Sequence, residues 1–474
     1  MPTSDVAQGA EAAARERTRR VTLTVLFLVA LVSWVVIANS VLTLMLVPYG
    51  SKSEIAWTDY AGQDELDCVI VGTSTAMSGI DPTVVDRRLG AHSFNLATPS
   101  QLLDESYLAV RTAYEDHGIT RVILSLSHSQ VMRSSTPNPG SAFMHQRSRV
   151  VSVGQELEGL RYLLLDGGAI AQPSSLNMAF PWVSNKVSES LGAIVTNARM
   201  KLDGTSLYEA AETNERGWHY QGKGFGYYTS TLNFNGSKAQ SYFTQDNPED
   251  RGVEVERSAA MDADRARALA DLCDYCVAHD IELIAVAPPL PDFTLVEYGE
   301  AYFTLSQALE DFMAEHGCRY FDINRARPEL YASQESYFHD STHLTLDGAE
   351  AFSEAVCSLF ERLEAGEETG GLFYEGLDRL DAIDYISCVF VDREAAADGI
   401  HLQARAMAGP SVPVEYRLCV HEGDDWRVVE DWGARSDFVF LPERGRRGAV
   451  ELRVEARKAG GTEADRHRDL IAMY

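Results

Sequence analysis

Basic residues are scarce in this chain. Its 474 residues include 41 Lys and Arg against 70 Asp and Glu, which gives a net charge of −29 at pH 7. A nucleic-acid partner requires a basic face that neutralises phosphates, so the shortage argues against one. The apolar share is 45%, which is ordinary for a globular protein and argues against a mainly disordered chain. The length leaves room for two or three domains.

Cysteine is scarce as well, and the seven cysteines leave at least one thiol unpaired. Cys273 and Cys276 form a CxxC pair, but no second CxxC completes a zinc site. Their stretch has helical spacing, so we expect small apolar core residues and not a redox pair. Disulfides are permitted outside the membrane, and Cys388–Cys419 or Cys276–Cys318 could form one. Nothing in the sequence calls for a cofactor or a metal.

One segment, residues 21–47, has no charged residue at all. A helix needs about 20 apolar residues to cross a bilayer, so this segment is long enough. It follows a group of four arginines: Arg15, Arg17, Arg19 and Arg20. The positive-inside rule then places residues 1–20 in the cytoplasm and the rest of the chain outside. A cleaved signal peptide is the alternative, with a cleavage site near Ala38. The apolar run continues past that site, which favours an uncleaved signal-anchor and a single-pass cell-membrane protein.

After residue 65, strand patterns alternate with helix patterns. Short apolar runs predict five strands, over 68–72, 93–97, 121–127, 282–289 and 319–323. Helical spacing predicts four helices, over 105–118, 260–279, 305–317 and 346–365. This alternation predicts an α/β fold with a doubly wound parallel five-stranded sheet. Catalytic groups in such sheets gather at the carboxyl ends of the strands.

Two regions depart from this alternation. Residues 130–258 form a long insertion between the third and fourth strands, and residues 217–236 within it are rich in Gly and Tyr. This insertion is either a structured surface loop or a lid that forms a substrate wall. Residues 376–474 alternate with period two and contain no helix-length segment. They predict a C-terminal all-β sandwich, with residues 366–371 as the linker.

Two short motifs carry residues that could do chemistry. The first strand runs into Gly72-Thr73-Ser74-Thr75, where a serine on a tight turn is a candidate nucleophile. Ser74 could equally be a helix N-cap. Further along, Asp340 and His343 form an Asp-x-x-His motif before the last predicted helix. A carboxylate at this spacing can orient an imidazole and stabilise its cation, although an N-cap and a surface histidine would show the same pattern.

Residues 65–365 together resemble the SGNH (GDSL-like) hydrolase family. The resemblance is carried by VIVGTSTAMSGIDP (69–82), SFNLATPS (93–100) and HDSTHLTLDGAEAF (339–352). It implies a flavodoxin-like SGNH-type domain in which Ser74 is the nucleophile, His343 the general base and acid, and Asp340 the orienting carboxylate. It also implies an oxyanion site formed by the N–H groups of Ser74 and Ala97, to which Asn95 could contribute. The third-block Asn of the family is absent, and we expect a structural role for His128, which follows the third strand.

The single anchor, the GIDP ending and the long insertion resemble the membrane-anchored, envelope-modifying members of this family. These include D-alanyl transfer proteins of teichoic acid systems and exopolysaccharide O-acetylation proteins, which often work with a membrane-bound O-acyltransferase. Residues 376–474 resemble triple-tyrosine Ig-like modules, and we expect Trp426 and Trp432 to lie in the sandwich core. The resemblance implies an extracytoplasmic serine esterase or acyltransferase. Its substrates would be acetyl or D-alanyl esters of a cell-envelope polysaccharide or teichoic-type polymer. The alternative is a non-catalytic polymer-binding or assembly subunit on the same scaffold.

Overall fold

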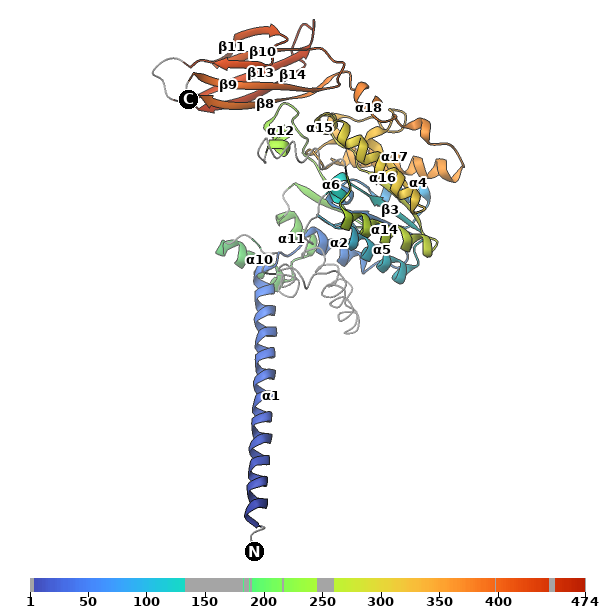
Figure 1. Ribbon diagram of the computed structural model, residues 1–474, viewed down its shortest axis with the longest axis vertical. Helices are drawn as coiled ribbons and strands as arrows, with labels where there is room; N and C mark the ends of the chain where they lie inside the picture. The colour runs from blue at the N-terminus through green and yellow to red at the C-terminus, as the bar shows by residue number, and fades with distance from the viewer. Residues whose placement is uncertain are drawn as a thin grey trace.

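The computed structural model describes residues 4–132, 182, 187, 190–214, 217–244, 260–396, 398–442 and 448–473. Of residues 4–14, 213–214 and 241–244, only the backbone is described. Three parts follow one another along the long axis of the molecule: an N-terminal helix, an α/β part and a β part (Figure 1). The predicted order of the three parts is therefore found in the structure.

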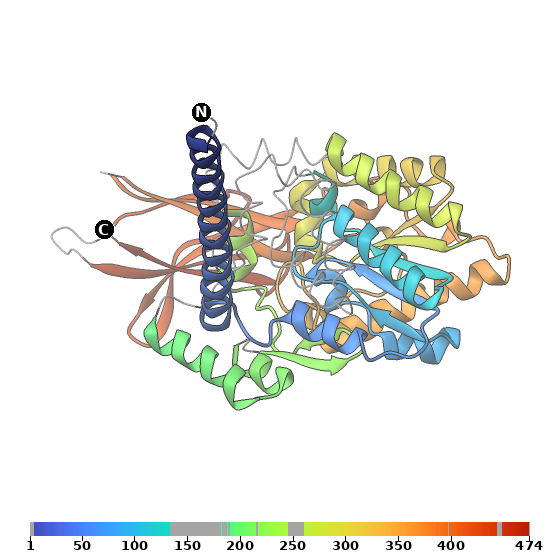
Figure 2. The same cartoon turned by 90° about the horizontal axis from the view of Figure 1, so that it is seen from below.

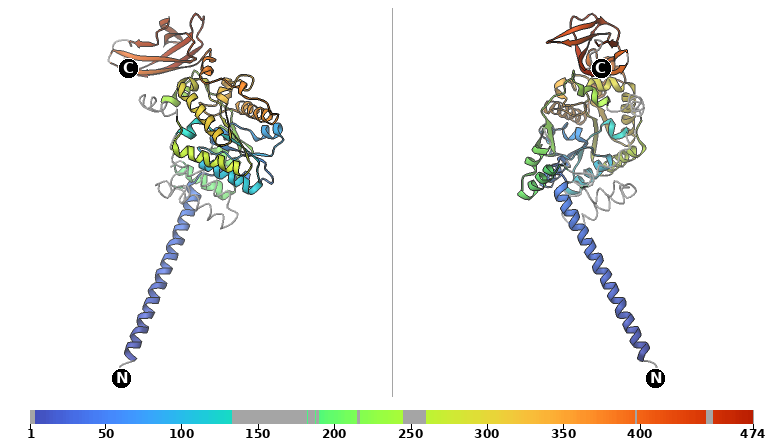
Figure 3. Two further views of the ribbon diagram at one scale, coloured as in Figure 1. Left: turned by 45° about the vertical axis from the view of Figure 1, so that its right-hand side comes forward. Right: turned by 90° about the vertical axis from the view of Figure 1, so that its left-hand side faces the viewer.

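The N-terminal helix α1 extends over Ser4–Leu46 and projects from the rest of the chain as a straight rod (Figure 3). Within it, Arg15–Leu46 is long and apolar enough to cross a membrane, and its most apolar window is not buried in the protein. Large side chains such as Phe27 and Trp34 are about two thirds exposed (66% and 67%). This exposure excludes a buried core helix and fits a single membrane anchor.

The end of α1 is tied to the helix α10 (Leu191–Asp203), which lies beside it (Figure 2). The Asn197 amide donates hydrogen bonds to the carbonyls of Met45 and Val47, at 3.0 and 2.8 Å. Lys201 Nζ donates to three carbonyls of the same end: those of Thr43, Leu44 and Val47. These bonds satisfy carbonyls that the last turn of a helix leaves without partners, and they place a cation at its negative pole.

A five-stranded sheet forms the centre of the α/β part. Its strands are β1 (Cys68–Gly72), β2 (Ser93–Asn95), β3 (Arg121–Ser125), β6 (Glu282–Ala287) and β7 (Arg319–Asp322). All neighbouring strands pair in parallel, in the order β2-β1-β3-β6-β7. All five strands begin at the residue where they were predicted to start. The order reverses between β1 and β3, which is the point where doubly wound sheets bind their ligands.

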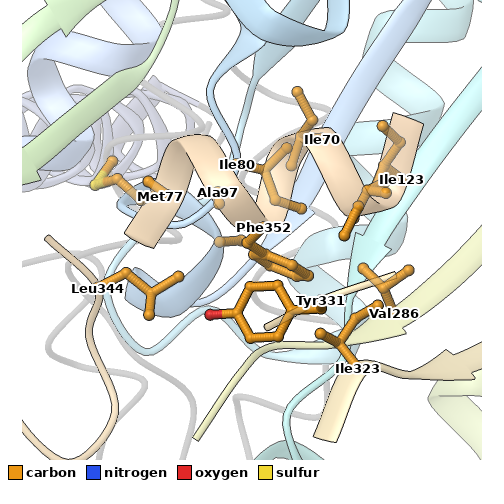
Figure 4. Close-up of a cluster of buried hydrophobic side chains, with 14 of the residues drawn as sticks. Ile70, Met77, Ile80, Ala97, Ile123, Val286, Ile323, Tyr331, Leu344 and Phe352 are labelled. Carbon is orange, nitrogen blue, oxygen red and sulfur yellow. The ribbon is translucent and has the colours of Figure 1, made fainter. Parts of the chain in front are cut away.

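Helices cover both faces of this sheet and bury the two sides of each strand. Along β1, Val69 and Val71 face one apolar cluster and Ile70 faces the other. The first cluster lies under α5 (Leu103–His117), α14 (Ala263–Ala278) and α16 (Glu300–Glu315). The second lies under α4 (Pro82–Leu89) and α17 (Leu346–Glu364), where Phe352 packs against the sheet (Figure 4). Burial on both faces explains why the strands read as continuous apolar runs.

The long insertion is described in part: residues 133–181 and 245–259 lie outside the described residues. Its described portion holds α10, α11 (Leu207–Asn214), α12 (Ser237–Thr244) and a hairpin of β4 (Trp218–Gly222) and β5 (Phe225–Tyr228). Trp218 and Phe225 are buried in the α/β core. The hairpin therefore packs on the domain as a wall, and its end bridges to Thr345 through Tyr228.

The C-terminal part consists of two antiparallel sheets. One holds β8 (Ile386–Ala396), β9 (Gly399–Ala408) and β12 (Asp437–Phe440). The other holds β10 (Val414–Glu422), β11 (Asp425–Gly433), β13 (Ala449–Lys458) and β14 (Arg466–Met473). Side chains of both sheets share one apolar core, including Leu402, Leu418 and Leu452. The predicted all-β sandwich is thus present, and Phe390 joins it to the α/β core through Phe293.

One prediction for this region was wrong. Trp426 and Trp432 do not lie in the sandwich core. Arg453 stacks on Trp426 at 4.1 Å, and Arg457 stacks on Trp432 at 4.1 Å. Both tryptophans are only partly buried, because they face away from the apolar residues of β13.

Neither of the two disulfides that the sequence allowed is formed, since all seven cysteines are free and buried. Cys388 packs with the α/β core, whereas Cys419 lies on β10 in the other sheet. Cys273 and Cys276 are buried in the α/β core, as predicted for the CxxC pair. Cys276 and Cys318 are both free, and Cys273 Sγ lies 3.6 Å from Met313 Sδ.

Candidate active site

Ser74 stands where β1 ends, at the point where the strand order reverses. Gly72 closes the strand with φ 145°, and a Cβ there would lie 2.6 Å from the Ser125 carbonyl oxygen. Only glycine fits such a turn. Thr73 is the N-cap of the short helix α3 (Ser74–Met77), which makes Ser74 the first helical residue. The N-cap role considered for Ser74 therefore belongs to Thr73.

His343 and Asp340 come from the turn before α17 and meet Ser74 in space. His343 Nε2 lies 2.8 Å from Ser74 Oγ. Its Nδ1 lies 2.9 Å from Asp340 Oδ2 and 3.1 Å from Oδ1. Asp340 Oδ1 also accepts the backbone N–H of His343 at 2.7 Å, which closes the Asp-x-x-His turn. The structure brings together all three side chains that the sequence singled out, with the hydrogen bonds of a Ser-His-Asp triad.

The charge of Asp340 is fixed by its surroundings. Burial alone would raise the pKa of its carboxyl group. Hydrogen bonds from the His343 imidazole and from the N–H groups of Thr342 and His343 outweigh that effect and hold the pKa well below its ordinary value. The carboxylate therefore stays ionised and favours the proton on Nδ1 of His343. Nε2 is then free to accept the proton of the serine hydroxyl.

The groups expected to hold an oxyanion have other partners. The Ala97 N–H donates to Asn95 Oδ1 at 3.0 Å. Asn95 Nδ2 donates to the carbonyls of Ala76 and Ile80, at 2.9 and 3.0 Å, which uses both amide hydrogens. In this arrangement the two residues brace the segment after β2 against the segment that carries the serine. The backbone N–H of Ser74 has no partner among the described residues, and it is the donor left beside Oγ.

An aromatic wall formed by Tyr228 and His339 flanks the triad on one side. The Tyr228 ring of β5 lies 5.6 Å from the His343 ring. The same ring stacks on His339 at 4.1 Å with an interplanar angle of 5°. Lys52 Nζ donates to the Tyr228 hydroxyl at 2.9 Å. The Gly- and Tyr-rich composition of residues 217–236 was the only sequence signal for this wall, and it did not single out Tyr228.

A cavity of about 60 Å³ adjoins the triad, lined by Thr75 and Thr342, the neighbours of Ser74 and His343. His128, which the sequence placed at the end of the third strand, also lines it. It begins the short helix α6 (His128–Met132), and its ring stacks on Tyr302 at 3.9 Å. Burial lowers the pKa of His128 to about 4, so the imidazole is neutral near pH 7.

Comparisons with known proteins add nothing to this geometry. No family model and no curated protein matches the chain. Among solved structures, the chain is matched to the endo-β-1,4-mannanase from Thermotoga petrophila at 10% sequence identity. That match covers 89% of this chain and 93% of the mannanase chain with a TM-score of 0.16. A TM-score this low carries no inference about fold or activity, so the functional argument rests on the site itself.

Proposed function

We propose that this protein is a membrane-anchored serine esterase or O-acyltransferase of the SGNH type, acting on acyl esters of cell-envelope glycopolymers outside the membrane. The observation that carries the proposal is the hydrogen-bonded chain from Ser74 Oγ through His343 to Asp340. Its position at the carboxyl edge of a parallel sheet, where the strand order reverses, is where such folds place their chemistry.

The geometry supports a two-step acyl transfer. Ser74 Oγ attacks the ester carbonyl while its proton passes to His343 Nε2, and Asp340 stabilises the resulting imidazolium. The Ser74 N–H stabilises the oxyanion. The bond to the leaving alcohol then breaks, His343 gives its proton to that alcohol, and an acyl-enzyme remains. Water or a polymer hydroxyl, deprotonated by His343, attacks this ester and restores the free serine.

The environment of the site supports a glycopolymer as one reactant. The wall formed by Tyr228 and His339 offers aromatic surface next to the triad, and sugar rings pack against such surface. The chain carries a net charge of −29, so a neutral or zwitterionic glycan is favoured over an anionic teichoic-type polymer. The resemblance to envelope-modifying proteins adds a membrane-bound O-acyltransferase as the partner that supplies acyl groups.

The orientation and the β part complete the proposal. The arginines before α1 place the N-terminus in the cytoplasm, and α1 then carries the catalytic part outside. The three-stranded and four-stranded sheets of the sandwich have the division expected of an Ig-like module. We assign that module a spacer or polymer-binding role.

The test is covalent labelling of the full-length protein in detergent with a fluorophosphonate probe. We expect one labelled serine, identified as Ser74 by mass spectrometry, and loss of labelling in Ser74→Ala. The matched control is Ser333→Ala, which removes an exposed hydroxyl away from the triad and should leave labelling unchanged. Labelling that persists in Ser74→Ala would refute the mechanism.

The second candidate function is a non-catalytic polymer-binding subunit, and one observation favours it. Ala97 and Asn95 are engaged elsewhere, so the oxyanion site has fewer donors than the family pattern implies. Loss of a single oxyanion donor costs about 10²–10³ in rate in a serine hydrolase. Absence of labelling together with retention of envelope polymer on the folded protein would support this candidate.

A further inference from the structure

The cavity beside the triad has two polar groups with nothing to bind. His128 and Thr294 both line it, and both are buried, at 9% and 1% exposure. Among the described residues, no hydrogen-bond partner is present for His128 Nε2 or Thr294 Oγ1, both of which are fully buried atoms. A buried polar atom left unpaired is destabilising, and such atoms are rare in native proteins. The two residues that carry these atoms line the same cavity, and a ligand bound there is the nearest group that could supply the missing bonds once their side chains turn toward it.

The other hydroxyl groups on this cavity are already satisfied. Thr75 Oγ1 is 2.9 Å from Thr73 Oγ1, and Ser127 Oγ is 3.1 Å from Ser129 Oγ. Thr342 Oγ1 donates to Asp340. The two unpaired atoms are therefore a specific feature of His128 and Thr294 and do not reflect a generally polar wall.

The His128 ring is also held in place. It stacks on Tyr302, whose hydroxyl donates to Asp322 Oδ1 at 3.1 Å and accepts from Asn324 Nδ2 at 2.7 Å. These partners are buried, so the ring against which His128 packs has little freedom to move. A fixed imidazole presents its hydrogen-bonding atoms in one geometry, which is what recognition of a small group requires.

Size and charge restrict the ligand further. One water-sized centre needs about 10–15 Å³ of such volume, so about 60 Å³ holds roughly four to six heavy atoms. No Asp, Glu, Lys or Arg lines the cavity among the described residues. A charged acyl group would thus be desolvated without a counter-ion, which is strongly unfavourable. This disfavours the ammonium of a D-alanyl group.

We infer that this cavity is the acyl-binding site of the enzyme and selects short, uncharged acyl groups that carry a hydroxyl, such as a 3-hydroxybutyryl or lactyl group. The acyl hydroxyl would bond with His128 and Thr294 while the acyl carbonyl lies at Ser74. The inference rests on the proposed function: the ester C–O bond breaks, the Ser74 Oγ–acyl bond forms, and the serine proton leaves on the alcohol through His343. A plain acetyl group would leave both atoms unpaired.

The test compares two esters of equal shape on the full-length protein in detergent. In p-nitrophenyl 3-hydroxybutyrate a hydroxyl stands where p-nitrophenyl isovalerate has a methyl group. Two hydrogen bonds of about 1 kcal/mol each predict a kcat/KM ratio of about 30 in favour of the hydroxy ester. Thr294→Val keeps the shape of the side chain, and we expect it to lower this ratio about fivefold while fluorophosphonate labelling of Ser74 remains.

The control and the contrary outcomes separate the two hypotheses. Thr304→Val makes the same change on the exposed face of α16 and should leave the ratio unchanged. His128→Phe combined with Thr294→Val should make isovalerate the better ester. Equal turnover of both esters by the wild type, or a ratio unaffected by Thr294→Val, overturns the acyl-site inference alone. Absence of both turnover and labelling overturns the proposed function and this inference together.

Discussion

Protonation of His128 should destabilise the folded protein in mild acid. Its pKa falls from 6.5 to about 4 on folding because burial disfavours the charged ring. Between these two values the unfolded chain binds more protons than the folded one, so stability rises with pH in this window and falls as the medium is acidified. The stability difference grows as the pH falls from about 7, is nearly complete at pH 4 and is almost absent above pH 7.

The magnitude follows from the two pKa values. A pKa shift of one unit corresponds to about 1.4 kcal/mol. Relative to pH 7.5, protonation at His128 should therefore lower the free energy of unfolding by about 2 kcal/mol at pH 5 and about 3 kcal/mol at pH 4. His128→Phe keeps an aromatic ring against Tyr302 and removes the titrating group. The free energy of unfolding of both proteins would be measured by urea titration in detergent at a series of pH values.

As the pH falls, the free energy of unfolding of His128→Phe should rise relative to that of the wild type by these amounts, because the two proteins share all other titrating groups. The comparison uses the difference between the two proteins at each pH, so any stability change from the substitution itself appears at pH 7.5 and is subtracted. Parallel curves for the two proteins between pH 6.5 and pH 4 would refute the assignment of His128 as a buried neutral imidazole.

Three further substitutions test the site and its supports. Asp340→Asn should lower kcat on an ester about 10³–10⁴-fold with little change in KM, because an amide favours the wrong tautomer of His343; a loss under tenfold would argue against an orienting carboxylate. Asn95→Ala removes three hydrogen bonds and should lower the free energy of unfolding by about 3 kcal/mol in urea titration; an unchanged urea midpoint would contradict this bracing role. Asp292→Ala leaves the guanidinium of Arg379, only 13% exposed, without its partner at 2.5 Å, which should cost about 3–5 kcal/mol. Residue 385 lies where the chain passes from the α/β part to the β part, so limited proteolysis should cut the variant there sooner than the wild type. Equal cleavage rates would show that this ion pair does not stabilise the connection between the two parts.

The sheet was predictable from the sequence because each strand is covered on both faces. CVIVG and ELIAVA are apolar without alternation, and such short runs bounded by turn residues have few other places in a fold. The glycine at position 118 ends α5 in the left-handed conformation, as its place after a helical pattern predicts. Local signals of this kind need no knowledge of distant partners.

The triad was predictable from the sequence for a similar reason. Ser74 follows a strand, Asp340 and His343 share one turn, and parallel strands bring their carboxyl ends to one edge. The meeting of Ser74 and His343 was therefore an inference from topology. Whether these residues perform catalysis stays a prediction, because the geometry alone does not show turnover.

What the sequence could not give depends on contacts between distant segments. Asn95 bonds to carbonyls that only the folded turn after Ser74 presents, so its bracing geometry was not visible in the pattern. The tryptophans on β11 alternate as core residues would, but Arg453 and Arg457 on β13 cover them from the outside. Tyr228 reaches the triad through a hairpin whose register is set by the core packing of Trp218.

The way α1 is joined to the rest of the chain determines where this protein can work. Helix α1 ends at Leu46 and α2 (Lys52–Tyr60) begins at Lys52. Asn197 and Lys201 both donate hydrogen bonds to the carbonyl of Val47, which lies between the two helices. Only residues 47–51 separate the two helices, which is too short for a long flexible tether between α1 and the α/β part. With α1 in a bilayer, Ser74 is held at a fixed distance from the lipid surface and in a fixed orientation. Under the proposed function, the polymer would have to reach a site at this fixed distance, so modification would be confined to chains that are still close to the membrane.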